Sequence, residues 1–359
     1  MGYATSPSMK VIIFLMFVLV ATTSSQSQNT RCPFDLLYHL GDGVFDNGNA
    51  VANMQHGSRL PAANIPYGNT HPGKPTGRWS DGLLDIDYGA QGLGFSEITA
   101  YLSENSSSAN AIMFAEKPRI KIPSYTVSLN IQMSWFKKYL NAICPTPTDR
   151  ADKLSNALFL FGDVEANDIT YSLIQRKSIQ QVQSYIPYVT KAQINAAREV
   201  IKMGATRIIL PGNAPMGLGA DPGSCANTAD YDDMGCLKSV NDLIKLKNNE
   251  LQQAIFGLQK EFPNTFIMYA DFYNSELALI QETSISGKNK KMALQACCGV
   301  GGKYNYDKKR FCGYPGVPVC SDPNQYFFWD GIHLTQEANN RLSSALQQAT
   351  LATLNCTIS

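Results

Sequence analysis

Charged side chains are scarce in this sequence of 359 residues: they make up 16% of it, and the 30 Lys and Arg nearly cancel the 29 Asp and Glu. The net charge of +1 lacks the basic excess that nucleic-acid-binding proteins usually carry. A disordered chain would hold more charge and less apolar mass than the 44% hydrophobic content found here. The composition therefore predicts a folded protein with no nucleic-acid partner.

Long hydrophobic runs are missing too, except at the N-terminus. Residues 11–20 (VIIFLMFVLV) follow Lys10 and precede small residues, which is the pattern of a secretory signal peptide. A retained membrane anchor is the weaker alternative, because a membrane span needs about 20 apolar residues. We expect residues 1–25 to be a signal peptide and residues 26–359 to form one domain with no stable membrane insertion. Such a protein would be secreted, to the cell exterior or to the vacuole.

Histidine is rare, with four residues in the chain, whereas cysteine is frequent, with nine. No histidine stands at zinc-ligand spacing beside a cysteine, so we expect no metal site. We expect no cofactor either. An exported chain meets an oxidising compartment in which cysteines pair, and an odd number leaves at least one thiol over. The cysteines are Cys32, Cys144, Cys225, Cys236, Cys297, Cys298, Cys312, Cys320 and Cys356.

Neighbouring cysteines suggest local disulfides. Cys225 and Cys236 lie in one expected loop before a helix and are candidates for a pair. Cys32 and Cys356 are expected either to find distant partners or to stay free. The pairing of four further cysteines stays open. Cys297 or Cys298 could pair with Cys312 or Cys320.

Two sequons for N-glycosylation agree with export. One begins at Asn105 (NSS) and the other at Asn355 (NCT). Sequons also arise by chance, so they add only weak support.

Four short apolar runs, each followed by turn residues, predict buried strands. Helical patterns lie between them; one ends at Gly204, a residue suited to a C-cap, and Thr335 is expected to cap the last helix. Strands that alternate with helices predict a three-layer α/β/α sandwich with a central, mostly parallel sheet. The expected strands are 35–40, 157–161, 207–210 and 265–270, and the expected helices are 127–140, 186–203, 239–262 and 335–351.

Ligands of such a sheet bind outside the carboxyl ends of its strands, so the residues that follow each strand are expected to carry the chemistry. Two of these segments directly follow expected strands, and three others stand out elsewhere in the chain. The segments are GDGVFDNGN (41–49), TGRWSDG (76–82), GDVEAND (162–168), ACCG (296–299) with YNY (304–306), and WDGIHLT (329–335).

In this order, the five segments resemble the motifs of the plant GDSL esterase/lipase family, within the SGNH hydrolases, and the resemblance spans about residues 31–359. It implies an SGNH-hydrolase, flavodoxin-like fold and a Ser-His-Asp triad whose serine follows the first strand. By this correspondence His333 is the base and Asp330 the carboxylate that orients it, a spacing that suits an Asp–imidazole pair. Asn167 and the N–H of Gly43 take the positions of oxyanion donors.

The nucleophile position holds Gly43: the chain has Gly-Asp-Gly-Val where the family has Gly-Asp-Ser-Leu. Glycine has no side chain with which to form an acyl-enzyme, and loss of a serine nucleophile costs on the order of 10⁶ in kcat. The family's donor glycine of the second block aligns loosely with Lys117 or Pro118, and proline has no N–H to donate. Loss of one such oxyanion donor lowers kcat by a factor of roughly 10²–10³. Ordinary acyl-enzyme ester hydrolysis is therefore not expected.

Other side chains in these segments have structural alternatives. Ser80 is either a substitute nucleophile or, as its position in the family implies, a structural hydroxyl. Asp42 is expected to accept backbone N–H groups at the turn after the first strand. Four aromatic residues either line a pocket or pack in the core: Trp79, Phe327, Phe328 and Trp329.

Three functions are compatible with the sequence. The first is a repurposed enzyme in which His333 acts as a general base on a small, metabolite-like molecule in the former acyl pocket. The second is a non-catalytic pseudoenzyme that binds a small molecule or regulates. The third is an ester hydrolase that uses a His-activated water or another nucleophile. In each case we expect a small-molecule partner and a monomer, with the loops at 51–75 and 213–236 setting specificity.

Overall fold

The structure is a computed structural model. It describes these residues: 30–53, 57–115, 129–162, 169–170, 172–173, 175–216, 230–233, 235–285, 294–302, 304–307 and 309–358. The predicted signal peptide, Asn167, Cys225 and the 117–118 segment lie outside them. Within the described ranges, no helix is long and apolar enough to cross a membrane.

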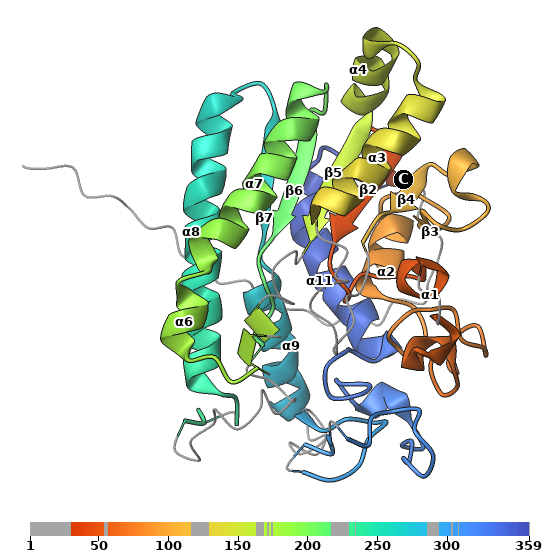
Figure 1. The fold of residues 1–359 in the computed structure, drawn as a ribbon, viewed down its shortest axis with the longest axis vertical. Coiled ribbons are helices and arrows are strands. Elements are labelled where there is room, and N and C mark those ends of the chain that lie inside the picture. Colours follow the sequence, from red (N-terminus) through yellow and green to blue (C-terminus); the bar gives the residue numbers. More distant parts are fainter. Residues whose placement is uncertain are drawn as a thin grey trace, which may run out of the picture.

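A parallel sheet of six strands forms the centre of the molecule, in the spatial order β3-β4-β2-β5-β6-β7 (Figure 1). Its strands are β2 (Leu36–Gly41), β3 (Thr99–Ala100), β4 (Ala111–Met113), β5 (Ala157–Gly162), β6 (Arg207–Pro211) and β7 (Phe266–Ala270). The register pairs Gly41 with Gly162 and Pro211 with Ala270, so the strands end together along one edge. The predicted α/β class with a parallel central sheet is confirmed.

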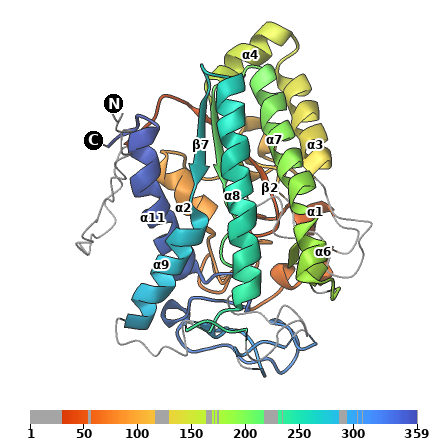
Figure 2. The same ribbon diagram turned by 90° about the vertical axis from the view of Figure 1, so that its left-hand side faces the viewer.

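Helices cover both faces of the sheet (Figure 1, Figure 2). One face carries α3 (Leu129–Ile143), α7 (Ile186–Lys202) and α8 (Lys238–Glu261), and the other carries α2 (Asp85–Gly92) and α11 (Gln336–Thr353). The remaining helices are α1 (Asn49–Asn53), α4 (Pro147–Ser155), α6 (Ile179–Gln183) and α9 (Phe272–Ile285), with 3-10 turns at Gly57–Arg59, Pro61–Ala63, Ser106–Ser108 and Pro323–Gln325.

The expected elements are found with small shifts at their ends. All four predicted strands match β2, β5, β6 and β7 to within one residue, and the four predicted helices match α3, α7, α8 and α11 to within three. Thr335 caps α11 as expected, because its Oγ1 accepts the N–H of Ala338. The short strands β3 and β4 and the helices α1, α2, α4, α6 and α9 were not predicted.

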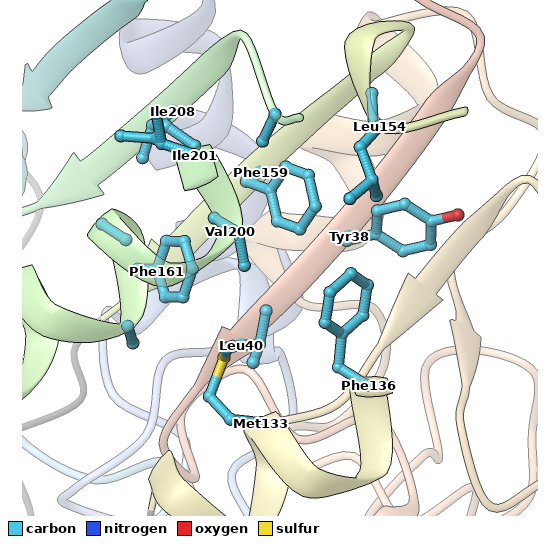
Figure 3. Close-up of a cluster of buried hydrophobic side chains, with 14 of the residues drawn as sticks. Tyr38, Leu40, Met133, Phe136, Leu154, Phe159, Phe161, Val200, Ile201 and Ile208 are labelled. Atoms are coloured by element: carbon cyan, nitrogen blue, oxygen red, sulfur yellow. The ribbon is translucent and has the colours of Figure 1, made fainter. Parts of the chain in front are cut away.

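Successive side chains of β2 point to opposite faces of the sheet and so join two separate core clusters. Leu36, Tyr38 and Leu40 join the larger cluster, which lies beneath α3, α7 and α8, whereas Leu37 joins a second cluster beneath α2. Figure 3 shows the larger cluster, in which Tyr38 meets Phe136 of α3 edge to face, with ring centroids 5.3 Å apart. Each buried side chain of this size stabilises the fold by about 1.5–3 kcal/mol. This double burial holds β2 rigid up to the point where the turn containing Gly43 begins.

Three disulfides tie the described chain together. Cys32 pairs with Cys356, and beside this bond β1 (Thr30–Arg31) and β8 (Thr357–Ile358) form a small antiparallel sheet. Of the pairings left open by the sequence, the structure contains Cys297–Cys320 and Cys298–Cys312. Disulfides of this kind persist in oxidising compartments, which agrees with the expected export.

Candidate active site

His333 and Asp330 form a buried, hydrogen-bonded pair. His333 Nδ1 lies 2.6 Å from Asp330 Oδ2, and the two side chains are only 4% and 0% exposed. The other carboxylate oxygen, Oδ1, accepts the backbone N–H groups of Ile332 at 3.0 Å and of His333 at 2.8 Å. Asp330 thus fixes both the ring and the backbone of the same histidine. With Nδ1 held by the carboxylate, Nε2 is the ring nitrogen that can exchange a proton with a bound molecule.

A tight turn brings the two residues together. The N–H of Trp329 donates to the carbonyl of His333 at 2.7 Å and closes the turn. Gly331, inside it, has φ +87°, a left-handed conformation that favours glycine. A Cβ at this position would also lie only 2.7 Å from Cδ2 of Tyr306. Both the backbone conformation and the close approach of Tyr306 therefore favour glycine here.

Tyr67 is a third member of this cluster, and the sequence did not predict it. Its hydroxyl donates to Asp330 Oδ2 at 2.7 Å, and the side chain is fully buried. Its ring meets Trp79 and Trp329 edge to face, with centroids 5.8 and 6.0 Å away. Burial first, and the neighbouring Asp330 carboxylate second, raise the pKa of Tyr67 well above its usual value. Tyr67 is therefore a neutral donor, and with it the carboxylate accepts at least four hydrogen bonds.

The segment 76–82 supports His333 from the side. The Trp79 ring lies over the His333 ring, with centroids 5.2 Å apart. Ser80 is fully buried and its Oγ donates to the carbonyl of Leu334 at 3.0 Å, so it serves as a structural hydroxyl. Asp81 Oδ1 accepts the N–H of Gln336, at the start of α11, at 2.7 Å. This segment therefore anchors the loop that carries the histidine.

The aromatic residues of these segments belong to the core. Their exposures are 4% for Trp79, 0% for Trp329 and 3% for both Phe327 and Phe328. Trp79 and Trp329 pack with Tyr67 in one cluster, and the two phenylalanines pack in another. Core packing, the alternative to a pocket lining, is what the structure supports.

Gly43 lies in a buried turn directly after β2. Asp42 holds the turn as expected: its Oδ1 accepts the N–H of Val44 at 3.2 Å, and its carbonyl accepts the N–H of Phe45 at 3.3 Å. Gln132 of α3 fixes the preceding strand end, since its side chain accepts the N–H of Gly41 at 2.9 Å and donates to the same residue's carbonyl at 2.6 Å. The sequence did not predict this role of Gln132.

A close backbone contact connects Gly48, five residues after Gly43, with the segment beside His333. A Cβ at Gly77 would lie 2.6 Å from Cα of Gly48, the residue before α1. Two residues after Gly77, the Trp79 ring packs over His333. The segment 76–82 therefore contacts both the start of α1 and the Asp330–His333 turn. Asn167, the candidate oxyanion donor, lies outside the described residues.

A second buried histidine lies on β2, before the turn. His39 is completely buried, and this burial lowers its pKa to about 3, so the ring is neutral. Nδ1 lies 3.1 Å from the sulfur of Met113, and the ring packs against Phe45 with centroids 4.6 Å apart. Nε2 has no hydrogen-bond partner among the described residues. His39 is therefore part of the core beneath the turn.

The fold and the His333–Asp330 pair define an α/β protein with a parallel central sheet and a buried, hydrogen-bonded His–Asp pair. The family model of the GDSL-like Lipase/Acylhydrolase family matches residues 37–346. Acetylajmalan esterase 2 of Rauvolfia serpentina is 40% identical over 99% of this chain and 100% of its own length. A GDSL esterase/lipase of Arabidopsis thaliana is 34% identical over 99% of both chains. The chain belongs to the GDSL lipase/acylhydrolase family. In the part of the chain that the structure describes, no cluster of His, Cys, Asp and Glu is suited to hold a metal ion.

Proposed function

We propose that this protein is a secreted GDSL-family member that lacks the serine nucleophile and uses His333 for acid–base chemistry on a small molecule. One observation carries the proposal: a buried His333–Asp330 pair with well-formed hydrogen bonds accompanies a glycine at position 43. In this proposal residues 1–25 are removed as a signal peptide, and residues 26–359 act as a single, monomeric domain.

His333 is the proposed base. Asp330 holds its Nδ1 and would stabilise the imidazolium that forms when Nε2 takes a proton. General acid–base catalysis of this kind contributes about 10²–10⁴ to a rate. Tyr67, which donates to the same carboxylate, helps to hold Asp330 in place.

Gly43 excludes the usual first step of the family, because no side-chain oxygen is available to take up an acyl group. The space of the missing hydroxymethyl group would hold a water molecule or part of a substrate. The N–H of Gly43 and the side chain of Asn167 remain the proposed donors to developing negative charge. The proposed reaction is therefore proton transfer to or from the bound molecule, without an acyl-enzyme.

The proposed substrate is a largely neutral, metabolite-like molecule. Relatives at 40% and 38% identity are named for the hydrolysis of acetylajmalan. The near-zero net charge of this chain suits a molecule of low charge.

A second candidate is direct ester hydrolysis, in which His333 activates a water molecule that attacks the ester carbonyl. The esterase names of the relatives favour it. It differs from the family reaction because no covalent intermediate forms.

Ester chemistry is tested on the wild type, Gly43→Ser, His333→Ala and the double variant, with p-nitrophenyl acetate and acetylajmalan. We expect no burst and no covalent adduct from the wild type. Gly43→Ser should gain a burst of p-nitrophenol that the double variant lacks, because the serine would depend on His333. A burst and an acyl adduct from the wild type itself would overturn the proposal. Steady, burst-free hydrolysis that depends on His333 would select the second candidate.

Acid–base chemistry is tested with a library of plant metabolites in D₂O, followed by mass spectrometry for new products and for deuterium uptake. We expect at least one compound to react about 10²-fold faster with the wild type than with His333→Ala. Thermal-shift measurements on both proteins serve as the control for folding and binding. Equal binding by both, with no conversion or exchange, would identify a binding protein and refute the acid–base role.

A further inference from the structure

A cavity of about 310 Å³ lies at the amino edge of the sheet, away from the His333–Asp330 pair. Arg207 and Phe266, at the starts of β6 and β7, contribute to its lining, as does Asn355, two residues after the end of α11. His333 precedes the first residue of α11 and Asn355 follows its last, and a helix of 18 residues is about 27 Å long. The cavity is therefore distinct from the candidate active site.

Asn355 is also the first residue of the sequon Asn355-Cys356-Thr357. Its side chain is exposed and lines the cavity, and its backbone has φ +58°. The disulfide from Cys356 to Cys32 and the pairing of β8 with β1 fix the chain immediately after it. An acceptor asparagine thus stands at a defined position on the rim of an open cavity.

We propose that Asn355 carries an N-linked glycan whose first N-acetylglucosamine occupies this cavity. The amide nitrogen Nδ2 of Asn355 would displace the lipid diphosphate from C1 of a lipid-linked oligosaccharide. One C–N bond forms, the C–O bond to the diphosphate breaks, and Nδ2 loses one proton. Such donors are found in the secretory pathway, so the inference rests on the export that is part of the proposed function.

The cavity suits one sugar ring in size and in chemistry. Its volume is at the lower end of the roughly 300–1,000 Å³ of small-ligand pockets, so it accepts a single ring while the rest of the glycan extends into solvent. Nη1 of Arg207 donates to the carbonyl of Ser155 at 2.7 Å and to Thr206 Oγ1 at 3.1 Å. A guanidinium has five N–H donors, so others are available for sugar oxygens. The half-buried ring of Phe266 offers an apolar surface to the C–H face of the sugar.

The covalent link makes weak contacts sufficient. A sugar attached to Asn355 meets the cavity as an intramolecular ligand, and short tethers give effective concentrations in the millimolar range. A free monosaccharide would need much stronger contacts to stay bound. The occupant is therefore the glycan of this chain and not a free sugar.

The second sequon is a natural control. Asn105 is exposed beside the 3-10 turn Ser106–Ser108, and it is not part of the lining of this cavity. A glycan there would project into solvent. Loss of that glycan should therefore leave the amino edge of the sheet unchanged.

The first experiment measures site occupancy on the full chain secreted from plant or insect cells, by mass spectrometry of glycopeptides. We expect a glycan on Asn355 in the wild type and in Thr357→Ser, which keeps the sequon, and none in Thr357→Val, which removes it. A wild-type protein with an unmodified Asn355 overturns the inference. If secreted protein carries an unmodified Asn355, export stands and only the site fails; if the chain does not reach the medium and keeps residues 1–25, export fails as well.

The second experiment tests whether the first sugar is seated. An endoglycosidase trims the glycan to one N-acetylglucosamine, and hydrogen exchange is followed at residues 204–211 and 262–268. We expect the trimmed protein to keep the protection of the intact one, and Thr357→Val to lose protection there and to melt about 2–4 °C lower than Thr357→Ser. Asn105→Gln should change neither the hydrogen exchange of these residues nor the melting temperature. Equal exchange and equal melting in Thr357→Ser and Thr357→Val would overturn the seating.

Discussion

The hydroxyl of Tyr67 and the imidazole of His333 meet at one atom, Asp330 Oδ2, at distances of 2.7 and 2.6 Å. Two donors from segments 263 and 3 residues away from Asp330 thus share one carboxylate oxygen. The backbone saturates the other carboxylate oxygen. Asp330 is therefore held in one orientation whether or not His333 gives up its proton.

Replacing Tyr67 with phenylalanine tests this shared contact. The buried carboxylate would lose the Tyr67 donor at Oδ2, and a hydrogen bond to a charged group is worth about 1.5–3 kcal/mol. We expect urea unfolding to show a loss of about that size, and NMR to show a shifted His333 Nδ1 proton. Tyr101→Phe is the control, because Tyr101 lies away from Asp330 and packs against Phe114 and Trp135 at the larger core cluster. Unchanged stability and an unmoved resonance in Tyr67→Phe would contradict a role for the hydroxyl.

His39 predicts a dependence of stability on pH. Burial lowers its pKa to about 3 from 6.5, so the unfolded state takes up a proton below pH 6.5 while the folded state stays neutral. The contribution of neutral His39 is complete above pH 6.5 and is lost as the pH falls toward 3. Between pH 7 and pH 4.5, protonation of His39 in the unfolded state should lower the free energy of unfolding by about 2–3 kcal/mol.

Urea unfolding of wild type and His39→Gln at both pH values measures the effect. The variant should show a smaller loss between pH 7 and pH 4.5, whatever its stability at pH 7. His71→Gln is the control, because His71 is exposed. A loss of the same size in wild type and His39→Gln would show that another group is responsible.

Local patterns explain which parts of the fold were predictable. Strands β2, β5, β6 and β7 are continuous apolar runs, as expected for strands buried on both faces. The strands β3 and β4, of two and three residues, are too short to show any periodicity. Helix α2 (DIDYGAQG) contains two glycines and few apolar residues, so its composition did not indicate a helix.

The candidate site was predictable where its contacts are local. Asp330 and His333 lie three residues apart, so one turn can join them, and the D-x-x-H spacing carries that information. Tyr67 and Gln132 act on residues 263 and 91 positions away, and only the folded chain brings such residues together. The same limit applied to the cysteines: sequence left the partners of Cys297 and Cys298 open, and the fold selected them.

The three disulfides should differ in their contributions to stability. In the chain-entropy account, the gain grows with the loop that a disulfide closes. Cys32–Cys356 closes a separation of 324 residues and is expected to contribute about 6 kcal/mol. Cys298–Cys312 closes 14 residues and is expected to contribute about 3 kcal/mol. Guanidinium unfolding of the two double Cys→Ala variants measures the order; a greater loss from the shorter loop would show that native contacts outweigh chain entropy.

Gly331 provides a test of how the Asp330–His333 turn is held. An alanine here meets two obstacles, a φ of +87° and a Cβ only 2.7 Å from Tyr306 Cδ2. Gly316 shares the first without the second, since its φ is +78° and nothing lies within 4 Å of a Cβ. We expect Gly316→Ala to cost about 1 kcal/mol for the backbone alone and Gly331→Ala to cost about 2–4 kcal/mol, because Tyr306 must also move. Urea unfolding measures both, and the His333 Nδ1 proton reports on the turn. Equal losses would mean that Tyr306 yields without strain and that the left-handed backbone alone selects glycine at this turn.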